Sequence, residues 1–403
     1  MSVARALVGR GHDVRVLADP GLRSEVEATG ARHLRWTRAP IRSAPEPDAD
    51  FVRDWEAGPE GFARMRDRLA VGPAAAFAAD IREEVERSRP DLILTELLLF
   101  GGQVAAEAAG IPYVVLNPTI NVVPAPGVPP FGQGFLPAAS DADNERDRIA
   151  GEMGMQGWDE ALPALNAARD EQGLEPLEHV LDQGRSAARV LVMTSAAFDF
   201  IGRLPPTVKH VGPRLDDPGW AEAWEAPAGE EPLVLVALSS DYQAQEDLLR
   251  RIVTALGESP VRGVVTTGKG IDPAQFPAPP NVQVLRSAPH AEVLREASAV
   301  ITHCGHGSTI KALAAGLPLV CLPMGRDQLD VAARVVHRGA GVRLDATAEP
   351  SAIAAALDEV LGEPGYSEAA QRIAVAIAEE TAHDRAVEEI ESLLEARVAG
   401  AAV

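Results

Sequence analysis

The sequence predicts an α/β protein made of two Rossmann-like halves in tandem. Short runs of aliphatic residues alternate with helical patterns along most of the chain, first over 13–116 and again over 233–323. Near-continuous apolar strands separated by helices indicate parallel sheets that are covered on both faces. With 403 residues, 46% of them hydrophobic, the chain is long enough for two or three domains with substantial cores.

Strands in the first half are expected at 13–19 and 91–96, where aliphatic residues are concentrated. Helical patterns follow at 22–29 and 101–109, which places a helix after each of these strands. The segment 117–142 contains many Pro and Gly residues, so we expect it to form a long loop. Loops of this length in compact domains usually serve a function.

The second half repeats the alternation after 212–232, a Pro-, Gly- and acid-rich stretch with the composition of an inter-domain linker. Apolar residues at helical spacing from 366 to 398 predict one or two terminal helices, the last of which should pack back on the first domain. The expected parts are an N-terminal domain at 1–213, a linker at 214–232, a C-terminal domain at 233–380 and a terminal helix at 381–403. Strands of the C-terminal domain are expected at 233–240, 262–267, 282–285, 299–302 and 318–323.

The composition argues against several kinds of partner. The formal net charge is −22, whereas nucleic acid and anionic membranes are bound by basic surfaces, so we expect neither as a partner. No apolar run is long enough to cross a bilayer, so no membrane span is predicted. Cys304 and Cys321 lie in apolar surroundings and provide no disulfide framework, which fits a reducing compartment. We therefore expect a cytoplasmic protein.

One predicted strand of the C-terminal domain runs into THCGHGS, residues 302–308, just before a helical pattern. Parallel sheets bind ligands at the carboxyl ends of their strands, where the free amides of the next helix point outward. Gly305 and Gly307 would let a phosphate approach these amides closely, and His303, His306 and Ser308 add N–H and hydroxyl donors. The alternative is a plain tight turn in which Ser308 caps the helix.

A second polar group follows the next predicted strand. Asp327 and Gln328 together offer several hydrogen-bond acceptors and donors, which suits the hydroxyls of a sugar. A phosphate site and a hydroxyl site on neighbouring strand ends predict a nucleotide-sugar site. His303, Cys304 and His306 are also metal-binding residue types, but the sequence has no second ligand pair at zinc spacing, so we expect no metal.

The stretch 287–328, with SAPH, THCGHGS and GLPLVCLPMGRDQ, resembles the signature by which inverting UDP-glycosyltransferase-like enzymes bind their sugar donor. The likeness is greatest to actinobacterial enzymes that tailor natural products. It implies the GT-B fold, in which two Rossmann-like domains face across a cleft. It also implies transfer of a sugar from a TDP- or UDP-linked nucleoside-diphosphate sugar to a hydroxyl of a small lipophilic acceptor, with inversion and without a cofactor.

The resemblance assigns residues to three parts of this site. The nucleotide base would meet Ser287 and Ala288, and the sugar hydroxyls would meet Asp327 and Gln328. Many relatives have an acidic residue for the ribose where this chain has Lys311. This lysine could pair with a phosphate or point to solvent, and we expect the second. The diphosphate would be bound by Ser239, Ser240, His303, Gly305, His306, Gly307 and Ser308.

The resemblance leaves the catalytic base unassigned. In this family the base is a histidine on the loop after the first strand, and Met1 corresponds to a position beyond that loop. We therefore expect the first strand and the base to lie upstream of Met1. Glu96, at the end of a predicted strand, matches the carboxylate that orients the base in many relatives. An ordinary strand-end acid is the alternative for Glu96.

Two other functions stay open at this point. A sugar-nucleotide epimerase has a related diphosphate site, but it needs further carboxylates around the sugar. A non-catalytic helper protein would bind the nucleotide sugar with the same fold and lack the base. If the chain is a transferase, the loop 117–142 and the segment 36–75, which contains several aromatic residues, are candidates to line the acceptor pocket.

Overall fold

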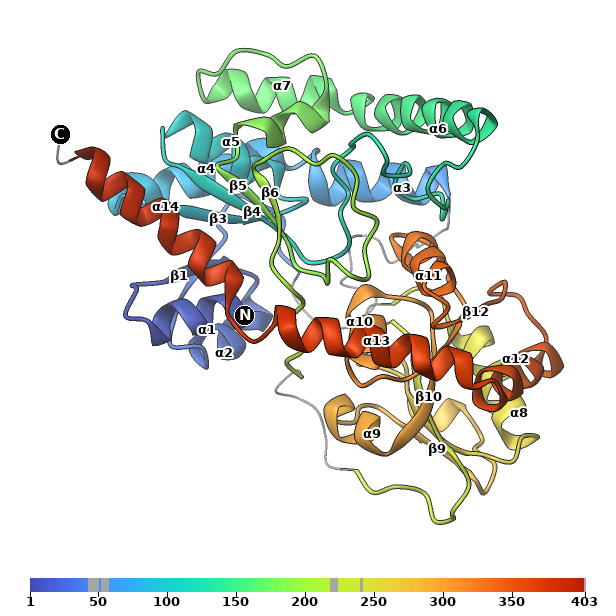
Figure 1. Ribbon diagram of the computed structural model, residues 1–403. Helices are drawn as coiled ribbons and strands as arrows, with labels where there is room; N and C mark the ends of the chain where they lie inside the picture. The colour runs from blue at the N-terminus through green and yellow to red at the C-terminus, as the bar shows by residue number, and fades with distance from the viewer. Residues whose placement is uncertain (43–50, 52–57, 218–223, 240–241, 402–403) are drawn as a thin grey trace.

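The computed structural model describes residues 1–42, 51, 58–217, 224–239 and 242–401. Parallel strands surrounded by helices occur in both halves of the chain (Figure 1). The predicted α/β class is therefore confirmed. We use "N-terminal half" for the described residues up to 213 and "C-terminal half" for those from 233 to 380.

A six-stranded parallel sheet forms the centre of the C-terminal half, in the order β12-β11-β10-β7-β8-β9. In β7, Leu233 and Leu235 belong to the hydrophobic cluster on one face, whereas Val234 and Val236 belong to the cluster on the other. Burial on both faces explains why this strand is a continuous apolar run in the sequence. The strands are β7 (Leu233–Ala237), β8 (Arg262–Thr266), β9 (Val282–Leu285), β10 (Ala297–Thr302), β11 (Leu319–Cys321) and β12 (Gly341–Arg343).

Helices cover both faces of this sheet. Leu249 of α8 and Leu357 of α12 belong to the cluster on one face, and Ile310 of α10 and Ile373 of α13 belong to the cluster on the other. Each helix thus buries an apolar stripe against the strands. The helices are α8 (Glu246–Gly257), α9 (His290–Glu296), α10 (His306–Ala314), α11 (Gln328–His337), α12 (Pro350–Gly362) and α13 (Pro364–Glu380).

The N-terminal half contains two parallel sheets. Among the described strands, β1 pairs only with β2, and a separate sheet has the order β3-β4-β5-β6. One edge of β1 and one edge of β3 are therefore unpaired, so the strands of this half do not form one continuous Rossmann-like sheet. The strands are β1 (Arg15–Ala18), β2 (Arg32–Arg35), β3 (Ile93–Glu96), β4 (Tyr113–Asn117), β5 (Arg189–Val192) and β6 (Val208–His210).

The long loop after β4 ends at α6, where Ser140 caps the helix by accepting a hydrogen bond from the amide of Asp143. The sequence analysis predicted neither α6 nor the following helix α7. None of the described side chains of α6 is buried, so this helix carries no apolar stripe that a sequence pattern could reveal. The helices of this half are α1 (Ser2–Gly9), α2 (Arg23–Glu27), α3 (Pro59–Met65), α4 (Ala74–Arg87), α5 (Phe100–Ala108), α6 (Asp141–Asp159) and α7 (Leu162–Glu171).

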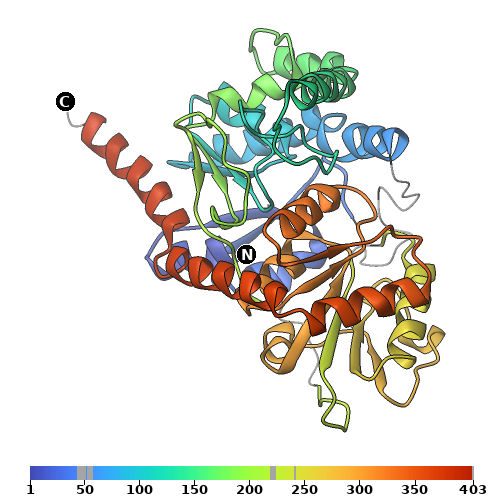
Figure 2. The ribbon, with the colours of Figure 1, turned by 45° about the vertical axis from the view of Figure 1, so that its right-hand side comes forward.

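The end of the chain, red in Figures 1 and 2, crosses from one half to the other. Helix α13 packs on α10, and the next helix, α14 (Arg385–Ala401), lies against α1. Val387 and Ile390 of α14 share a hydrophobic cluster with Val3 and Leu7 of α1. No helix in the described part of the chain is long and apolar enough to cross a membrane.

Close packing of α5 on α4 leads to a prediction about Gly101. A Cβ atom at this position would lie 2.3 Å from the carbonyl oxygen of Ala74 and 2.7 Å from Cβ of Phe77. We expect Gly101→Ala to lower the free energy of unfolding by about 1–3 kcal/mol, because the two helices must move apart. Gly154 in α6 is the control, since a Cβ there would have no neighbour within 4 Å.

Gly154→Ala should raise the free energy of unfolding by about 0.5–1 kcal/mol, because alanine favours the helix. Urea denaturation followed by circular dichroism measures both variants against the wild type. Equal effects of the two substitutions would contradict the described packing of α5 on α4.

Candidate functional site

The turn from β10 to α10 has an unusual main-chain conformation. β10 ends at Thr302, and the hydroxyl of Thr302 accepts a hydrogen bond from the amide of Cys304 at 3.1 Å. Cys304 itself has a φ of 65°, in the left-handed region that residues other than glycine rarely adopt. This conformation reverses the chain, so that α10 begins at His306, close to the end of the strand.

Gly305 allows the side chain of His303 to lie against the start of α10. A Cβ atom at Gly305 would be 2.5 Å from Nε2 of His303, so any larger residue would collide with the imidazole. The amide of Thr309 bonds to the carbonyl oxygen of Gly305 at 3.1 Å and closes the first helical turn. The amides of 306–308 come before the first bonded turn, so they have no partner within the helix. They point out of the amino end of α10, where the helix dipole favours an anion.

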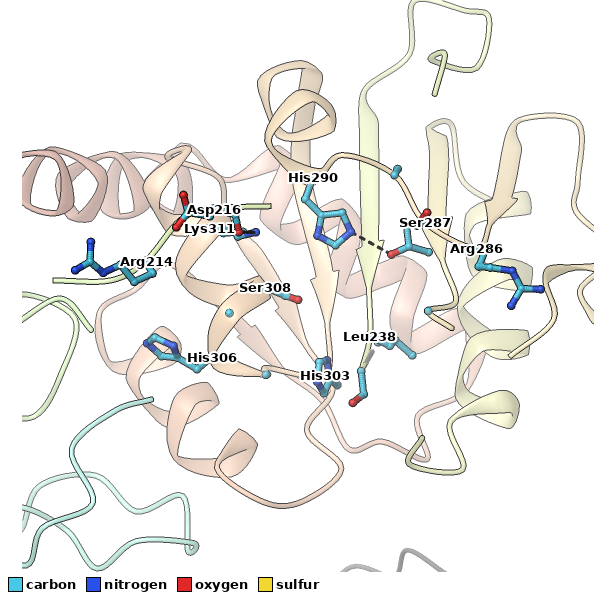
Figure 3. Close-up of a pocket in the computed structure, with 16 residues that line it drawn as sticks. Arg214, Asp216, Leu238, Arg286, Ser287, His290, His303, His306, Ser308 and Lys311 are labelled. Carbon is cyan, nitrogen blue, oxygen red and sulfur yellow. Dashed lines mark hydrogen bonds between the residues drawn. The ribbon is translucent and has the colours of Figure 1, made fainter. Parts of the chain in front are cut away.

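This helix end borders a pocket of about 490 Å³ (Figure 3). Residues after β7, β8 and β9 complete it, because the carboxyl ends of parallel strands meet at one edge of the sheet. All described residues that were predicted to bind the base or the diphosphate line this pocket, and Ser240 lies outside the described residues. The predicted residues in the lining are Ser239, Ser287, Ala288, His303, Gly305, His306, Gly307 and Ser308.

The pocket is lined by cations although the protein is acidic. Among its described lining residues, Arg214, Arg286 and Lys311 accompany a single carboxylate, that of Asp216, while the whole chain has a net charge of −22. Arg214 and Arg286 lie on opposite sides of it in Figure 3. Arg286 donates to the main-chain carbonyl of Lys269 at 3.2 Å, a neutral acceptor. Two of these cations are paired with carboxylates outside the lining, Lys311 with Asp217 at 2.7 Å and Arg214 with Asp384 at 3.0 Å. The described charges around the pocket therefore balance, and the amino end of α10 is the feature that favours an anionic ligand.

Burial keeps the histidines of this pocket neutral. Desolvation lowers the pKa of His303 to about 4, and burial also lowers the pKa of His290 and of His306. A neutral imidazole has one N–H donor and one acceptor nitrogen, so these rings would contact a phosphate by hydrogen bonding rather than by charge. Nε2 of His290 lies 3.3 Å from the hydroxyl of Thr266.

The expectation that Lys311 points to solvent is wrong. Its side chain is 14% exposed, and its ammonium donates to the carboxylate of Asp217 and to the carbonyl of Asp216, both at 2.7 Å. The second carboxylate oxygen of Asp217 accepts from the amide of Ala291 at 2.9 Å. These bonds tie the linker residues 214–217 to α9 and α10, so the linker forms part of the pocket wall.

The predicted sugar-binding residues lie at the start of α11, outside the described lining of the pocket. Gln328 is 1% exposed, and its carbonyl oxygen accepts from the amides of 324–325 at 2.8 and 3.1 Å. Its amide nitrogen hydrogen-bonds to Gln243 at 2.9 Å. To bind a sugar, Gln328 would have to break these bonds, so this role stays a prediction. Asp327 instead accepts from the hydroxyl of Thr119 at 2.6 Å.

Glu96 ends β3, as predicted, and its carboxylate accepts from the amide of Leu98 at 2.9 Å. The side chain is accessible to solvent, yet the protein around it desolvates the carboxyl and raises its pKa. The histidine nearest to the start of the chain, His12, bonds to Glu391 of α14 at 3.1 Å. A role for Glu96 in orienting a base stays a prediction.

The two halves meet along a polar seam centred on Asp199, which sequence reasoning did not find. The Asp199 carboxylate is fully buried and contacts Nε of Arg334 in α11 at 2.7 Å, Nε2 of His210 at 2.8 Å and the amide of Asn121 at 2.8 Å. Burial by itself would raise the pKa of Asp199, but these hydrogen bonds and the charge of Arg334 hold it below its usual value. Removal of either partner would leave an uncompensated charge buried between the halves.

Two α/β halves with a pocket at the strand ends of the C-terminal one are the architecture of the GT-B fold. The calicheamicin glycosyltransferase CalG4 has this fold and matches with a TM-score of 0.75 at 22% identity, over 98% of this chain and 94% of that one. The spinosyn rhamnosyltransferase SpnG, solved with thymidine diphosphate, matches with a TM-score of 0.64 at 21% identity, over 97% and 95% of the two chains.

Sequence relatives identify the family. The 4'-demethylrebeccamycin synthase of Lentzea aerocolonigenes is 30% identical over 97% of this chain and 95% of the relative. The oleandomycin glycosyltransferase of Streptomyces antibioticus is 28% identical over 98% and 88%. Residues 251–396 match the family described as erythromycin biosynthesis protein CIII-like, C-terminal domain. The chain belongs to the GT-B glycosyltransferases of natural-product biosynthesis, and the resemblance seen in its sequence is confirmed.

These relatives also decide between the functions that the sequence left open. Relatives named as glycosyltransferases, such as that of Streptomyces antibioticus, favour a glycosyltransferase over the sugar-nucleotide epimerase and over the non-catalytic helper protein. In the described part of the chain, no group of three or more His, Cys, Asp or Glu residues is placed to hold a metal ion. We predicted that the transfer reaction needs neither a metal nor another cofactor, and this stays a prediction.

A pH-dependent prediction concerns Asp330, which accepts from the amides of Gly132 and Gly134 at 2.5 and 3.0 Å. Desolvation raises the pKa of Asp330 to about 6, although these amides and Arg334 act in the opposite direction. An unfolded aspartate titrates near pH 3.9. Between these two values the folded state binds the proton and the unfolded state does not, so this group adds stability as the pH falls.

We expect the free energy of unfolding of the wild type, relative to Asp330→Asn, to increase by about 1 kcal/mol from pH 7.5 to pH 5.0. Urea denaturation of both proteins at the two pH values measures this difference, and the comparison cancels the other titrating groups. A difference that stays constant or shrinks on acidification would contradict the raised pKa.

Proposed function

We propose that this glycosyltransferase takes a TDP- or UDP-linked sugar as donor and transfers the sugar, with inversion, to a hydroxyl of a small lipophilic acceptor. The proposal places the diphosphate at the amino end of α10. It rests mainly on the pocket into which this helix end opens, where the amides of 306–308 face residues that follow β7, β8 and β9. The natural-product relatives support the choice of acceptor, and the resemblance in sequence supports inversion.

The chemistry of the pocket suits a departing diphosphate. As the bond to the sugar breaks, negative charge grows on the diphosphate, and hydrogen-bond donors fixed in advance stabilise that charge. Here these donors are the amides of 306–308, the hydroxyl of Ser308 and an N–H of neutral His303. Their positions are set by the main chain of the turn and by packing, so they need little rearrangement during the reaction.

The base and the sugar would extend from the diphosphate in two directions. Ser287 and Ala288 lie after β9 and would border the nucleotide base, and Asp327 at the start of α11 would bind sugar hydroxyls. Catalysis also requires a group that takes the proton of the acceptor hydroxyl, and Glu96 is proposed only as a residue that orients it.

The loop after β4 is our proposal for the acceptor side. Phe131 and Leu136 on this loop are exposed apolar side chains, at 44% and 45%. By contrast, Trp36 packs edge-on against Phe77 with ring centroids 4.9 Å apart, which makes it part of a core. Lipophilic acceptors would therefore meet the loop rather than Trp36. Trp55, another aromatic residue of the segment 36–75, lies outside the described residues. The absence of nucleic-acid partners and the cytoplasmic location stay predictions.

Calorimetric titration of the full chain with TDP and with UDP tests the proposal. We expect at least one nucleotide to bind, and we expect Ser308→Ala to weaken its binding by about 1.5–3 kcal/mol, because a hydrogen bond to a charged phosphate is lost. Ser392→Ala is the matched control. Ser392 is an exposed serine on α14 whose hydroxyl donates to the carbonyl of Glu389 at 2.8 Å.

The control variant should bind the nucleotide as the wild type does. Unchanged affinity of Ser308→Ala would remove Ser308 from the diphosphate site. If the wild type bound neither nucleotide, the proposed sugar donor would be wrong.

A further inference from the structure

Side chains of the N-terminal half contact two residues of the proposed sugar-donor site. The hydroxyl of Thr119, just after β4, lies 2.6 Å from Oδ2 of Asp327, and the hydroxyl of Thr194, just after β5, lies 2.8 Å from Nε2 of His306. The carbonyl of Pro118 also hydrogen-bonds to the His306 imidazole. The strand ends of one half thus meet the strand ends of the other at these two side chains.

Asp327 does not cap its own helix. It occupies the position before α11, where aspartate commonly accepts from amides of the first turn, yet its side chain makes no such bond. Its φ and ψ of −80° and −5° are helical and turn the carboxylate away from these amides. The direction of the carboxylate is therefore set from the other half of the protein, by Thr119.

Thr119 is itself held in a fixed turn. Its amide donates to Oδ1 of Asn117 at 3.2 Å, and the amide nitrogen of the fully buried Asn117 side chain donates to the carbonyl of Ile120 at 2.9 Å. Ile120 is fully buried in a hydrophobic cluster that contains residues of both halves, including Phe198. The hydroxyl of Thr119 is consequently presented to α11 by a rigid support.

Two further hydrogen bonds connect a later part of the loop after β4 to α11. Asp330 accepts from the amides of Gly132 and Gly134, and a Cβ atom at Gly134 would lie 2.9 Å from the carbonyl oxygen of Leu329. The first turn of α11 therefore binds the loop after β4 at two places. Several hydrogen bonds, and not one alone, therefore fix the distance between Thr119 and Asp327.

We propose that Thr119 is a positioning residue for the sugar of the donor. Its hydroxyl donates to one oxygen of the Asp327 carboxylate, which leaves acceptor capacity at the other oxygen for a hydroxyl of the sugar. The inference rests on the proposed function, because Asp327 meets a sugar only if the pocket binds a nucleotide sugar. Thr119 touches Asp327 rather than the ligand, so its effect is confined to the sugar, while the diphosphate is bound by α10.

The test compares nucleotides with and without a sugar. The full chain is titrated calorimetrically with TDP, TDP-glucose, UDP and UDP-glucose, as wild type and as Thr119→Val, Thr119→Ala and Thr119→Ser. We expect the valine and alanine variants to bind the sugar nucleotide about tenfold more weakly, because a hydrogen bond to a carboxylate is lost. Their affinity for TDP or UDP should equal that of the wild type, which also shows that they are folded.

Thr119→Ser keeps the hydroxyl and should bind every ligand as the wild type does. Thr254→Val is the control, since this exposed threonine on α8 bonds only locally, to the carbonyl of Arg250 at 2.9 Å. Equal loss of affinity for the nucleotide and for the sugar nucleotide, or no loss for either, would overturn the positioning role. Failure of the wild type to bind any of the four ligands would instead overturn the proposed function.

Discussion

The amino end of α10 is the feature on which the rest of this site depends. Its free amides are useful only if they face a space that a ligand can enter, and the parallel sheet provides that space by bringing the ends of β7, β8, β9 and β10 to one edge. The left-handed residue Cys304 and the absence of a side chain at Gly305 aim the helix at this edge. The positive end of the helix dipole would then favour a diphosphate, since Arg214 and Lys311 at the pocket are already paired with Asp384 and Asp217.

The seam between the halves makes the site a product of both. Helix α11 carries Asp327, Asp330 and Arg334, which contact residues after β4 and β5 of the N-terminal half. The linker adds a further connection, because Asp217 binds Lys311 on α10. A glycosyltransferase must hold two substrates in one geometry, so contacts that fix one half against the other contribute to catalysis as well as to stability.

Local patterns in the sequence predicted five of the six described strands of the C-terminal half, all but β12, and the turn at 302–308, because burial on both faces and a strand-to-helix turn leave marks within a few residues. Contacts between distant residues left no such mark. Thr119 and Asp327 are 208 positions apart, and Lys311 and Asp217 are 94 apart, so neither pairing was predictable. Gln328 was predicted to bind sugar from its residue type, whereas its environment uses the amide to hold a turn. Helix α6 went unpredicted because none of its described side chains is buried.

A crystal structure of the chain with TDP or UDP is the most direct test of whether the diphosphate binds at the amino end of α10. The account predicts diphosphate oxygens within hydrogen-bonding distance of the amides of 306–308 and of the Ser308 hydroxyl, with the base near Ser287 and Ala288. A nucleotide bound in this pocket with its diphosphate turned away from α10, or bound elsewhere on the protein, would contradict it.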